Sequence, residues 1–230
     1  TISNTTTANV ELNGAPTAGL ENRKNILTKF NGGNSVEVLK VEDFLNKNSE
    51  ESRNITRDND ILFLYQNHID AIGDSSKTEG SVFEAVDKTI DEIVTVLRKL
   101  MSANASNVFI TSDHGFIYQN EKLSESDFLS ESPSGSIQFS GRRFVLGRNL
   151  TETSGFKKFS SEQLKLGNDF DILFPKSINR LRKSGAGTRY IHGGLTLQEV
   201  ITPLIHVTKK RESDVSSVPV TILKGTPNQA

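Results

Sequence analysis

The chain has 230 residues, of which 34% are hydrophobic and 24% charged, a composition that predicts a soluble globular protein and excludes a membrane span or a long disordered tail. Its 27 Lys and Arg residues nearly balance its 28 Asp and Glu residues, so the net charge gives no argument for binding a nucleic acid or a membrane. The sequence has no cysteine, which excludes disulfides, thiolate metal sites and thiol catalysis and leaves oxygen and imidazole as metal ligands.

The first sixty residues predict short elements separated by polar loops. Residue 1 is not a methionine and no basic-then-apolar leader opens the sequence, so we expect part of a longer, cytoplasmic protein. Residues 1–20 are rich in Thr, Asn, Gly and Ala and predict loop or edge structure. We expect a helix at 22–30, a strand at 36–41 and a helical turn at 43–45, followed by a solvated loop at 46–60.

The middle of the chain predicts a strand, a helix and a second strand. Residues 61–65 (ILFLY) and 107–111 (NVFIT) are short apolar runs, typical of strands buried on both faces of a parallel sheet. Between them, Ser81 and Glu84 form a capping box, and apolar residues at three- and four-residue steps predict a helix over 82–101. This unit is long enough for a parallel crossover, so the sequence predicts an α/β fold with a mostly parallel sheet flanked by helices.

The last part of the chain predicts further strands and one more helix start. Thr196 and Glu199 form a second capping box, and Pro203 ends the segment. The other expected elements are a polar loop at 119–141, strands at 143–146, 170–174, 205–208 and 218–223, and a flexible loop at 185–187.

Three segments place side chains that can bind a metal at the ends of expected strands or in loops. They are residues 65–74 (YQNHIDAIGD), 111–116 (TSDHGF) and 190–194 (YIHGG). Sites in open α/β sheets lie at the carboxyl ends of strands, so we expect the segments to converge on one rim. Carboxylates and imidazoles are ligands for zinc, manganese or magnesium, and a pair of such ions can clamp the oxygens of a phosphoryl transfer.

Taken singly, several of these residues also have structural interpretations. Asp70 and Asp74 fit a helix start or a turn as well as a metal site, and His192 fits a loop held by backbone bonds. His68 and His206 fit structural roles better than catalytic ones. The case for a site therefore depends on the three segments as a set.

The Asp-His-Gly run has its own geometric requirement. Asp113 and His114 are adjacent, so their side chains would point apart in an extended strand. Both reach one metal site, or a pair of sites, only if the chain turns at Gly115.

The ordered set YQNHIDAIGD, VFITSDHGF and RYIHGGLTLQEVITPLI resembles the C-terminal part of the PglZ domain, a branch of the alkaline phosphatase superfamily found in BREX bacteriophage-exclusion systems. The segments NGAPTAGLENRKNIL and GRRFVLG also resemble PglZ sequence, so the resemblance covers most of the chain. It implies an alkaline phosphatase-like core, of which residues 1–230 would be the C-terminal portion. It also implies other BREX proteins as partners, with no membrane.

The resemblance further implies two divalent metal sites. Asp70, Asp74 and His192 occupy the positions of one metal's ligands, and Asp113 and His114 occupy positions of the second. Asp74 stands where relatives often have His. This extra carboxylate makes the first site more anionic and leaves manganese or magnesium open beside zinc.

The implied reaction is attack on a phosphate ester by a metal-activated Ser or Thr, followed by hydrolysis of a phospho-enzyme. In the family the nucleophile lies before the region that opens this chain, so we expect no catalytic nucleophile here and an inactive isolated chain. Basic residues near the motifs are candidates for binding the phosphate of an ester, a nucleotide or a nucleic acid, unless they form a solvated surface. Arg189 is the first candidate, and the others are Arg142, Arg143, Arg180, Arg182 and Lys183.

Two other functions stay open at this point. The domain could keep the fold and serve as a non-catalytic assembly platform within the defence complex. It could also belong to another branch of the superfamily, such as a phosphoglycerate mutase or a sulfatase. The sulfatase alternative is weakened because no Cys or Ser lies in a formylglycine-type context.

Overall fold

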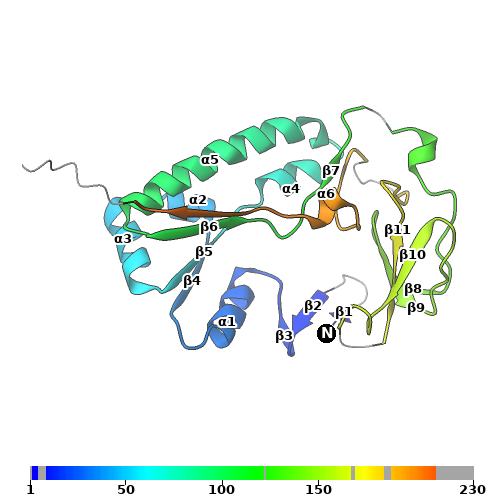
Figure 1. Cartoon of the computed structure of the whole chain (residues 1–230), viewed down its shortest axis with the longest axis horizontal. Coiled ribbons are helices and arrows are strands. Elements are labelled where there is room, and N and C mark those ends of the chain that lie inside the picture. Colours follow the sequence, from blue (N-terminus) through cyan, green and yellow to red (C-terminus); the bar gives the residue numbers. More distant parts are fainter. Residues whose placement is uncertain (1, 5–8, 122, 167–168, 184–187, 211–230) are drawn as a thin grey trace, which may run out of the picture.

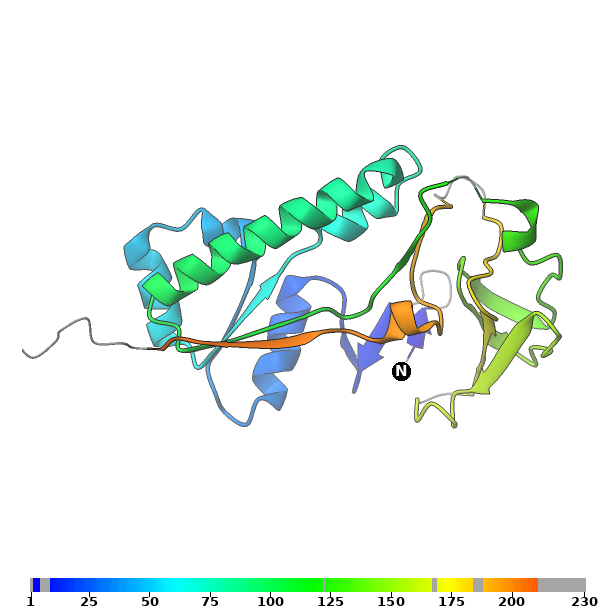
Figure 2. The same ribbon diagram turned by 45° about the horizontal axis from the view of Figure 1, so that its top comes forward.

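The computed structural model describes residues 2–4, 9–121, 123–166, 169–183 and 188–210. The molecule is elongated, with a helix-rich region at one end and an antiparallel sheet at the other (Figure 1). The turned view shows the same two regions, with thin connections between them (Figure 2). Among the described residues, no helix combines the length and the apolar character that crossing a bilayer requires.

The helix-rich region is built on two strand pairs beneath one long helix. β4 (Val36–Lys40) pairs in parallel with β5 (Ile61–Tyr65), and β6 (Asn107–Thr111) pairs antiparallel with β13 (Leu204–Thr208). α5 (Val82–Ser102) lies across these strands (Figure 1). The buried core between them consists of Val41, Phe44, Val96 and Leu100, with the half-buried Leu39, Leu62, Leu64 and Val108 packed against it.

The structure corrects the expected sheet. β5, α5 and β6 follow one another as predicted, but β5 pairs with β4 and β6 pairs with β13, so β5 and β6 are not hydrogen-bonded neighbours. Among the described strands β4 and β5 form the single parallel pair, so the mostly parallel sheet flanked by helices is replaced by small, mainly antiparallel sheets. Pairing partners are set by contacts between distant segments, which a local apolar pattern does not encode.

The burial predicted for β5 and β6 is also wrong. β5 is half-buried at every position, and β6 alternates between exposed and half-buried residues. Phe109, in the middle of β6, is 62% exposed. A run of five apolar residues fits a strand with one covered face as well as a strand covered on both faces, so the pattern alone could not decide.

The N-terminal elements are short, and most lie close to where the sequence predicts them. α1 (Leu20–Phe30) and α2 (Val41–Leu45) match the expected helices. A small antiparallel sheet of β1 (Ile2–Asn4), β2 (Asn9–Leu12) and β3 (Ala15–Pro16) lies where loop or edge structure is expected.

α3 (Ser49–Asp58) replaces the solvated loop expected at 46–60. The Asn48 side chain accepts a hydrogen bond from the backbone N–H of Glu51, and the Glu51 carboxylate accepts one from the backbone N–H of Asn48. This capping box satisfies two backbone donors at the helix start. Ser52 is the one buried residue of α3, so the sequence shows no apolar period that would predict this helix. The Asn-x-x-Glu spacing is nevertheless a sequence signature of a helix start.

The two predicted capping boxes have opposite outcomes. The short 3-10 turn η1 (Glu79–Ser81) leads into α5, and the Ser81 side chain makes no capping bond, so the first box is wrong. The second is confirmed, because Thr196 and Glu199 cap each other at the start of α6 (Leu197–Val200).

The far end of the molecule is a four-stranded antiparallel sheet. Its strands, in spatial order, are β10 (Phe156–Ser160), β11 (Asp171–Pro175), β9 (Val145–Arg148) and β8 (Ser136–Ser140). β9 and β11 match the strands expected at 143–146 and 170–174, whereas β8 and the turn η2 (Glu125–Asp127) lie inside the expected loop at 119–141. The expected strand at 218–223 and loop at 185–187 lie outside the described residues.

Three short elements connect the two ends. α4 (His68–Gly73) follows β5, and β7 (Ile117–Tyr118) pairs antiparallel with β12 (Tyr190–Ile191). Of the three segments singled out in the sequence, residues 65–74 include α4, residues 111–116 connect β6 to β7, and residues 190–194 begin with β12, so any common site lies between the helix-rich region and the sheet.

A buried ion pair ties the β8–β11 sheet to α6. Arg143, just before β9, and Glu199, in α6, have fully buried side chains, and two guanidinium N–H groups donate to the two carboxylate oxygens at 2.8 and 2.7 Å. Glu199 also accepts hydrogen bonds from the backbone of Gly194 and the hydroxyl of Thr196. Burial opposes the charge of Glu199, but the surrounding donors, Arg143 first among them, hold its pKa below the ordinary value.

We expect Glu199→Gln to lower the free energy of unfolding by about 3–5 kcal/mol, because it leaves the buried Arg143 guanidinium without its counter-charge. Urea denaturation followed by circular dichroism measures this change. Glu162→Gln, which removes the same charge from an exposed position, is the matched control and should change the unfolding free energy by less than about 0.5 kcal/mol. Equal effects of the two substitutions would contradict the role given to the pair.

The pH dependence of the unfolding free energy should also reflect the ion pair of Arg143 and Glu199. Because folding lowers the pKa of Glu199, its ionised form contributes stability that is fully present above its ordinary pKa of about 4.5 and is lost as the pH falls through the lower folded-state pKa. Urea titrations from neutral pH to below 4.5 should therefore show the wild type losing more unfolding free energy than Glu199→Gln. Parallel curves for the two proteins would count against this assignment.

Candidate metal centre

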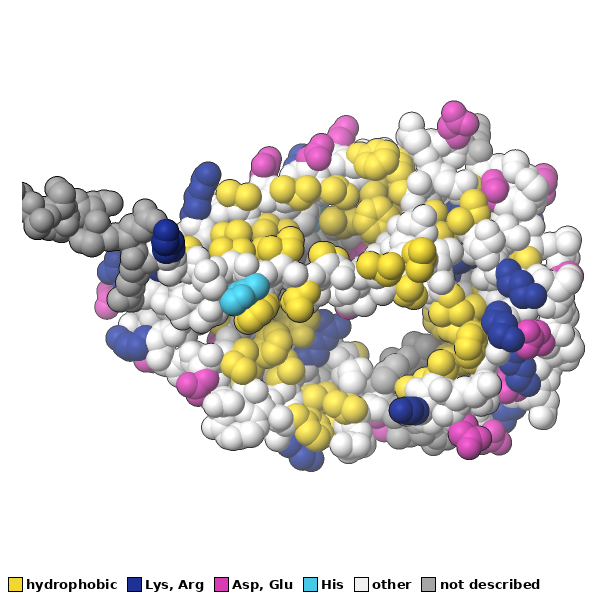
Figure 3. Space-filling model, in the orientation of Figure 1, with side chains coloured by type: hydrophobic (Ala, Val, Ile, Leu, Met, Phe, Trp, Pro, Cys, Tyr) yellow, Lys and Arg dark blue, Asp and Glu magenta, His cyan; other side chains and the backbone are white. Residues whose placement is uncertain are grey.

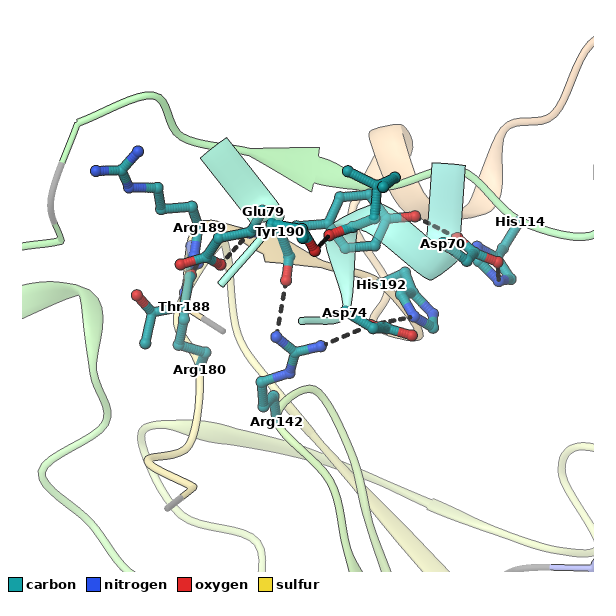
Figure 4. A network of polar contacts seen from close by, with 12 residues as sticks. Asp70, Asp74, Glu79, His114, Arg142, Arg180, Thr188, Arg189, Tyr190 and His192 are labelled. Atoms are coloured by element: carbon teal, nitrogen blue, oxygen red, sulfur yellow. Dashed lines mark hydrogen bonds and ion pairs between the residues drawn. The ribbon is translucent and has the colours of Figure 1, made fainter. Parts of the chain in front are cut away.

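The three segments meet at one place between the two ends of the molecule. Asp70 lies in α4, His114 follows β6, and His192 follows β12. One ligand atom from each of these side chains lies within 4.8 Å of the others, and Figure 4 shows the three side chains close together. We call these three residues the Asp-His-His cluster. It is the one group of three or more potential metal ligands of this kind found in the described part of the chain.

The three residues of the cluster are half-buried, so they remain partly accessible to solvent. The Nε2 atom of His114 is 3.8 Å from Oδ2 of Asp70, and the side chains of the two residues are 27% and 30% exposed. The imidazole rings of His114 and His192 stack with their centroids 4.3 Å apart and their planes within 1° of parallel. Tetrahedral zinc with bonds of about 2.0–2.1 Å needs ligand atoms about 3.4 Å apart, so small side-chain rotations would adapt the cluster to an ion.

The donor set itself indicates which ions fit. One carboxylate and two imidazoles are a common ligand combination for zinc, and imidazole also suits other transition metals. Magnesium prefers oxygen ligands and retains several of its waters, so it fits this set less well. The residues present are therefore compatible with a bound transition-metal ion.

Asp74 lies beside the cluster and is already engaged by a cation. Its Oδ1 atom accepts a hydrogen bond from Arg142 at 2.9 Å and is 3.3 Å from Nε2 of His192. Arg142 also donates to the backbone carbonyl of Tyr190 at 2.8 Å. The guanidinium balances the negative charge of Asp74, so this carboxylate adds less anionic character than its formal charge suggests.

Asp113 lies on the solvent side of the cluster. Its side chain is 85% exposed, and its Oδ1 atom is 3.8 Å from Nε2 of His114. The same oxygen accepts a hydrogen bond from the backbone N–H of His114. The structure thus brings Asp70, His114 and His192 together as one group, and places Asp74 and Asp113 at its flanks.

Arg189 points away from the cluster, although the sequence suggests it as a phosphate ligand (Figure 4). Its backbone N–H donates to Glu79, and its guanidinium lies near Gly80. Arg142 is the arginine whose side chain reaches the neighbourhood of the cluster. Closeness in sequence to a motif says nothing about where a long side chain points, which explains this difference.

Two further candidate arginines are structural. Arg143 and Arg180 are buried, with 1% and 0% exposure. Arg180 donates to the backbone carbonyl of Thr188 and to the side chain of Gln119. Burial, together with the nearby Arg143, lowers the pKa of Arg180 to about 10, which still leaves it charged at neutral pH. A fully buried guanidinium has no face left for a substrate phosphate.

Glycines allow the loops of the site to pack against α6. A Cβ atom on Gly115 would lie 2.0 Å from the carbonyl oxygen of Gln198, and the Gly115 N–H donates to the carbonyl of Glu199 at 2.9 Å. A Cβ atom on Gly194 would lie 2.5 Å from the Arg143 guanidinium. The sequence predicts a chain turn at Gly115, whereas the structure has a bend at Asp113 and no assigned turn at Gly115. At Gly115 the backbones instead approach too closely for any side chain.

Tyr190 is the residue of the site that the sequence analysis did not assign. Its hydroxyl donates to Oδ1 of Asp70, and its side chain is fully buried. Burial and the hydrogen bond to Asp70 raise the pKa of Tyr190, so the hydroxyl keeps its proton. The available signal was strand alternation, because Tyr190 precedes His192 by two residues and so faces the same side of an extended segment.

Comparison with known proteins identifies the family of the chain. Residues 1–207 match the family described as the BREX system PglZ alkaline phosphatase-like domain. Two curated relatives are the alkaline phosphatase-like protein BrxZ of Escherichia coli O9:H4 (strain HS), 30% identical over 91% of this chain and 24% of the relative, and the alkaline phosphatase-like protein PglZ of Bacillus cereus (strain H3081.97), 32% identical over 93% of this chain and 25% of the relative. The chain therefore spans about a quarter of the length of these relatives.

We expect Gly115→Ala to lower the free energy of unfolding by at least about 1–3 kcal/mol, because the new methyl group would collide with a backbone carbonyl that cannot rotate away. Gly80→Ala is the matched control, since the nearest heavy atom to its Cβ would be the Arg189 guanidinium at 3.9 Å. Thermal and urea denaturation of both variants measure the difference. A Gly115→Ala protein as stable as Gly80→Ala would refute the close approach.

Proposed function

Because the chain belongs to the PglZ alkaline phosphatase-like domain family of BREX systems, we propose that its Asp-His-His cluster binds a divalent metal ion and that the longer protein uses this ion to hydrolyse a phosphate ester in phage defence. The observation that carries the proposal is the convergence of Asp70, His114 and His192, which are far apart in sequence, to within 4.8 Å. A cytoplasmic location is part of the same proposal.

The proposed roles of the residues follow from their chemistry. A bound divalent ion would supply Lewis acidity to polarise a phosphoryl oxygen. Asp70 would supply the negative charge of the site, and His114 and His192 its nitrogen ligands. Arg142 lies at the edge of the cluster, and a guanidinium matches the geometry of a phosphate group. The Ser or Thr nucleophile is proposed to lie in the part of the longer protein that precedes this chain.

The proposed metal is a transition metal. Two imidazoles in a set of three favour zinc or manganese over magnesium. In our proposal Asp74 and Asp113, both next to cluster histidines, complete the ligand shell of this ion or of a second one. Two ions would provide the clamp on attacking and leaving oxygens that phosphoryl transfer uses.

A second candidate function is assembly, and one observation favours it. Large apolar side chains are exposed on β6, β13 and the neighbouring residues of α6, and Figure 3 shows hydrophobic surface along this face and over α5. The exposed fractions are 62% for Phe109, 69% for Leu197, 64% for Ile201, 72% for Leu204 and 51% for Ile205. Exposed apolar patches of this kind often mark interfaces. A BREX protein would be the partner, and this role is compatible with catalysis.

Metal binding tests the proposal directly. We expect zinc or manganese to bind this chain in isothermal titration calorimetry and His114→Ala to weaken that binding at least tenfold, because one of three clustered ligands is lost. His206→Ala is the matched control, since His206 is exposed on β13 and stacks on Phe109 outside the cluster. The longer protein carrying His114→Ala should also lose metal-stimulated hydrolysis of an aryl phosphate ester.

The outcomes separate the two candidate functions. A wild-type chain that binds neither zinc nor manganese would overturn the metal-dependent hydrolase and leave assembly as the better candidate. Equal weakening by His114→Ala and His206→Ala, with both variants shown by circular dichroism to be folded, would overturn the assignment of the metal to the cluster.

A further inference from the structure

The contacts around Tyr190 fix the direction in which its hydroxyl group points. The side chain is fully buried, and the hydroxyl donates to Oδ1 of Asp70. The ring packs closely against α4, because a Cβ atom on Gly73 would lie 2.4–2.7 Å from three ring carbons. On its other side the ring packs against Phe116, with the centroids 4.9 Å apart. This packing holds the ring plane in place and aims the hydroxyl at the carboxylate.

The backbone of Tyr190 is held as firmly as its ring. Its carbonyl accepts a hydrogen bond from Arg142 at 2.8 Å, and its N–H donates to the carboxylate of Glu79 at 3.5 Å. Glu79 is itself only 9% exposed and also accepts from the backbone N–H of Arg189 at 2.9 Å. Figure 4 shows this set of residues around Tyr190. The strand that leads to His192 is therefore anchored two residues before the histidine.

The hydrogen bond to Asp70 decides which carboxylate oxygen faces the cluster. Oδ1 accepts the hydrogen bond from the Tyr190 hydroxyl, whereas Oδ2 is the oxygen that lies 3.8 Å from Nε2 of His114. An aspartate without such a partner rotates about its terminal torsion and presents either oxygen. A second hydrogen-bonding residue that orients a metal ligand reduces the ordering cost of binding and often accounts for a 10–100-fold gain in metal affinity.

We propose that Tyr190 is a positioning residue that fixes the Asp70 carboxylate so that Oδ2 is presented to the metal ion. This inference rests on the proposed function, because it requires the Asp-His-His cluster to bind a metal. It adds that one short segment, β12 and the residue that follows it, carries both a proposed ligand, His192, and the group that orients another ligand, Asp70. The two parts of the site are thereby coupled through one backbone segment.

Tyr190→Phe tests the inference, because it keeps the ring that packs on Gly73 and removes only the hydroxyl. We expect it to weaken zinc binding about 10–100-fold in isothermal titration calorimetry of this chain, with the unfolding midpoint changed little. The d–d absorption spectrum of the Co²⁺-loaded chain should also change, because it reports the geometry of the ligands and not the stability of the fold.

Tyr118→Phe is the matched control. Tyr118 lies opposite Tyr190 in the β7–β12 pair, and its hydroxyl donates to the backbone carbonyl of Gly80 instead of the cluster. It should leave both zinc affinity and the Co²⁺ spectrum unchanged.

Each outcome has a distinct meaning. Wild-type affinity and an unchanged Co²⁺ spectrum in Tyr190→Phe would overturn the positioning role while leaving the proposed function intact. Equal weakening in both tyrosine variants would also overturn it, since the effect would then not depend on the bond to Asp70. A wild-type chain that binds no metal would instead overturn the proposed function itself.

Discussion

The buried pair of Arg143 and Glu199 is the constraint on which the arrangement of the site depends. Its two charges are removed from water, and they are stable there because Glu199 receives donors from the guanidinium, from Gly194 and from Thr196 at the same time. This single carboxylate therefore joins the β8–β11 sheet, the loop after His192 and the start of α6. Without this carboxylate five donors would lose their acceptor, namely two guanidinium N–H groups of Arg143, the backbone N–H groups of Gly194 and Thr196, and the Thr196 hydroxyl.

Near this ion pair, the charged residues of the site are linked by a series of hydrogen bonds. The Asp-His-His cluster is flanked by Asp74, whose charge is balanced by Arg142, and Arg142 in turn holds the backbone of Tyr190. Tyr190 then returns a hydrogen bond to the cluster at Asp70. These hydrogen bonds hold Asp70 and Asp74 in place and balance the charge of Asp74, while the charge of Asp70 stays available for the cation that we propose binds there.

Local sequence patterns predicted individual helices and strands well, but they predicted poorly which strands pair and where long side chains point. The long apolar period of α5 and the Thr-x-x-Glu box of α6 were sufficient to place those helices. The order of the three motifs predicted that their segments would converge, and Asp70, His114 and His192 do lie together, although the family resemblance divided these residues between two metal sites. Strand partners could not be predicted, since β5 and β6 look alike in sequence yet join different neighbours. The direction of the Arg189 side chain could not be predicted either, because the contacts of a long side chain depend on the whole fold.

The close contact at Gly115 has a consequence for how the Asp-His-Gly motif is interpreted in homologues. The glycine is needed because a carbonyl of α6 occupies the space of a side chain, whereas the neighbouring aspartate is largely in solvent. The requirement for glycine at position 115 thus comes from the packing of the fold and is separate from the metal binding that we propose for His114. A side chain at position 115 would disturb the packing against α6 whether or not a metal binds nearby, so the presence of this glycine is not by itself evidence of activity.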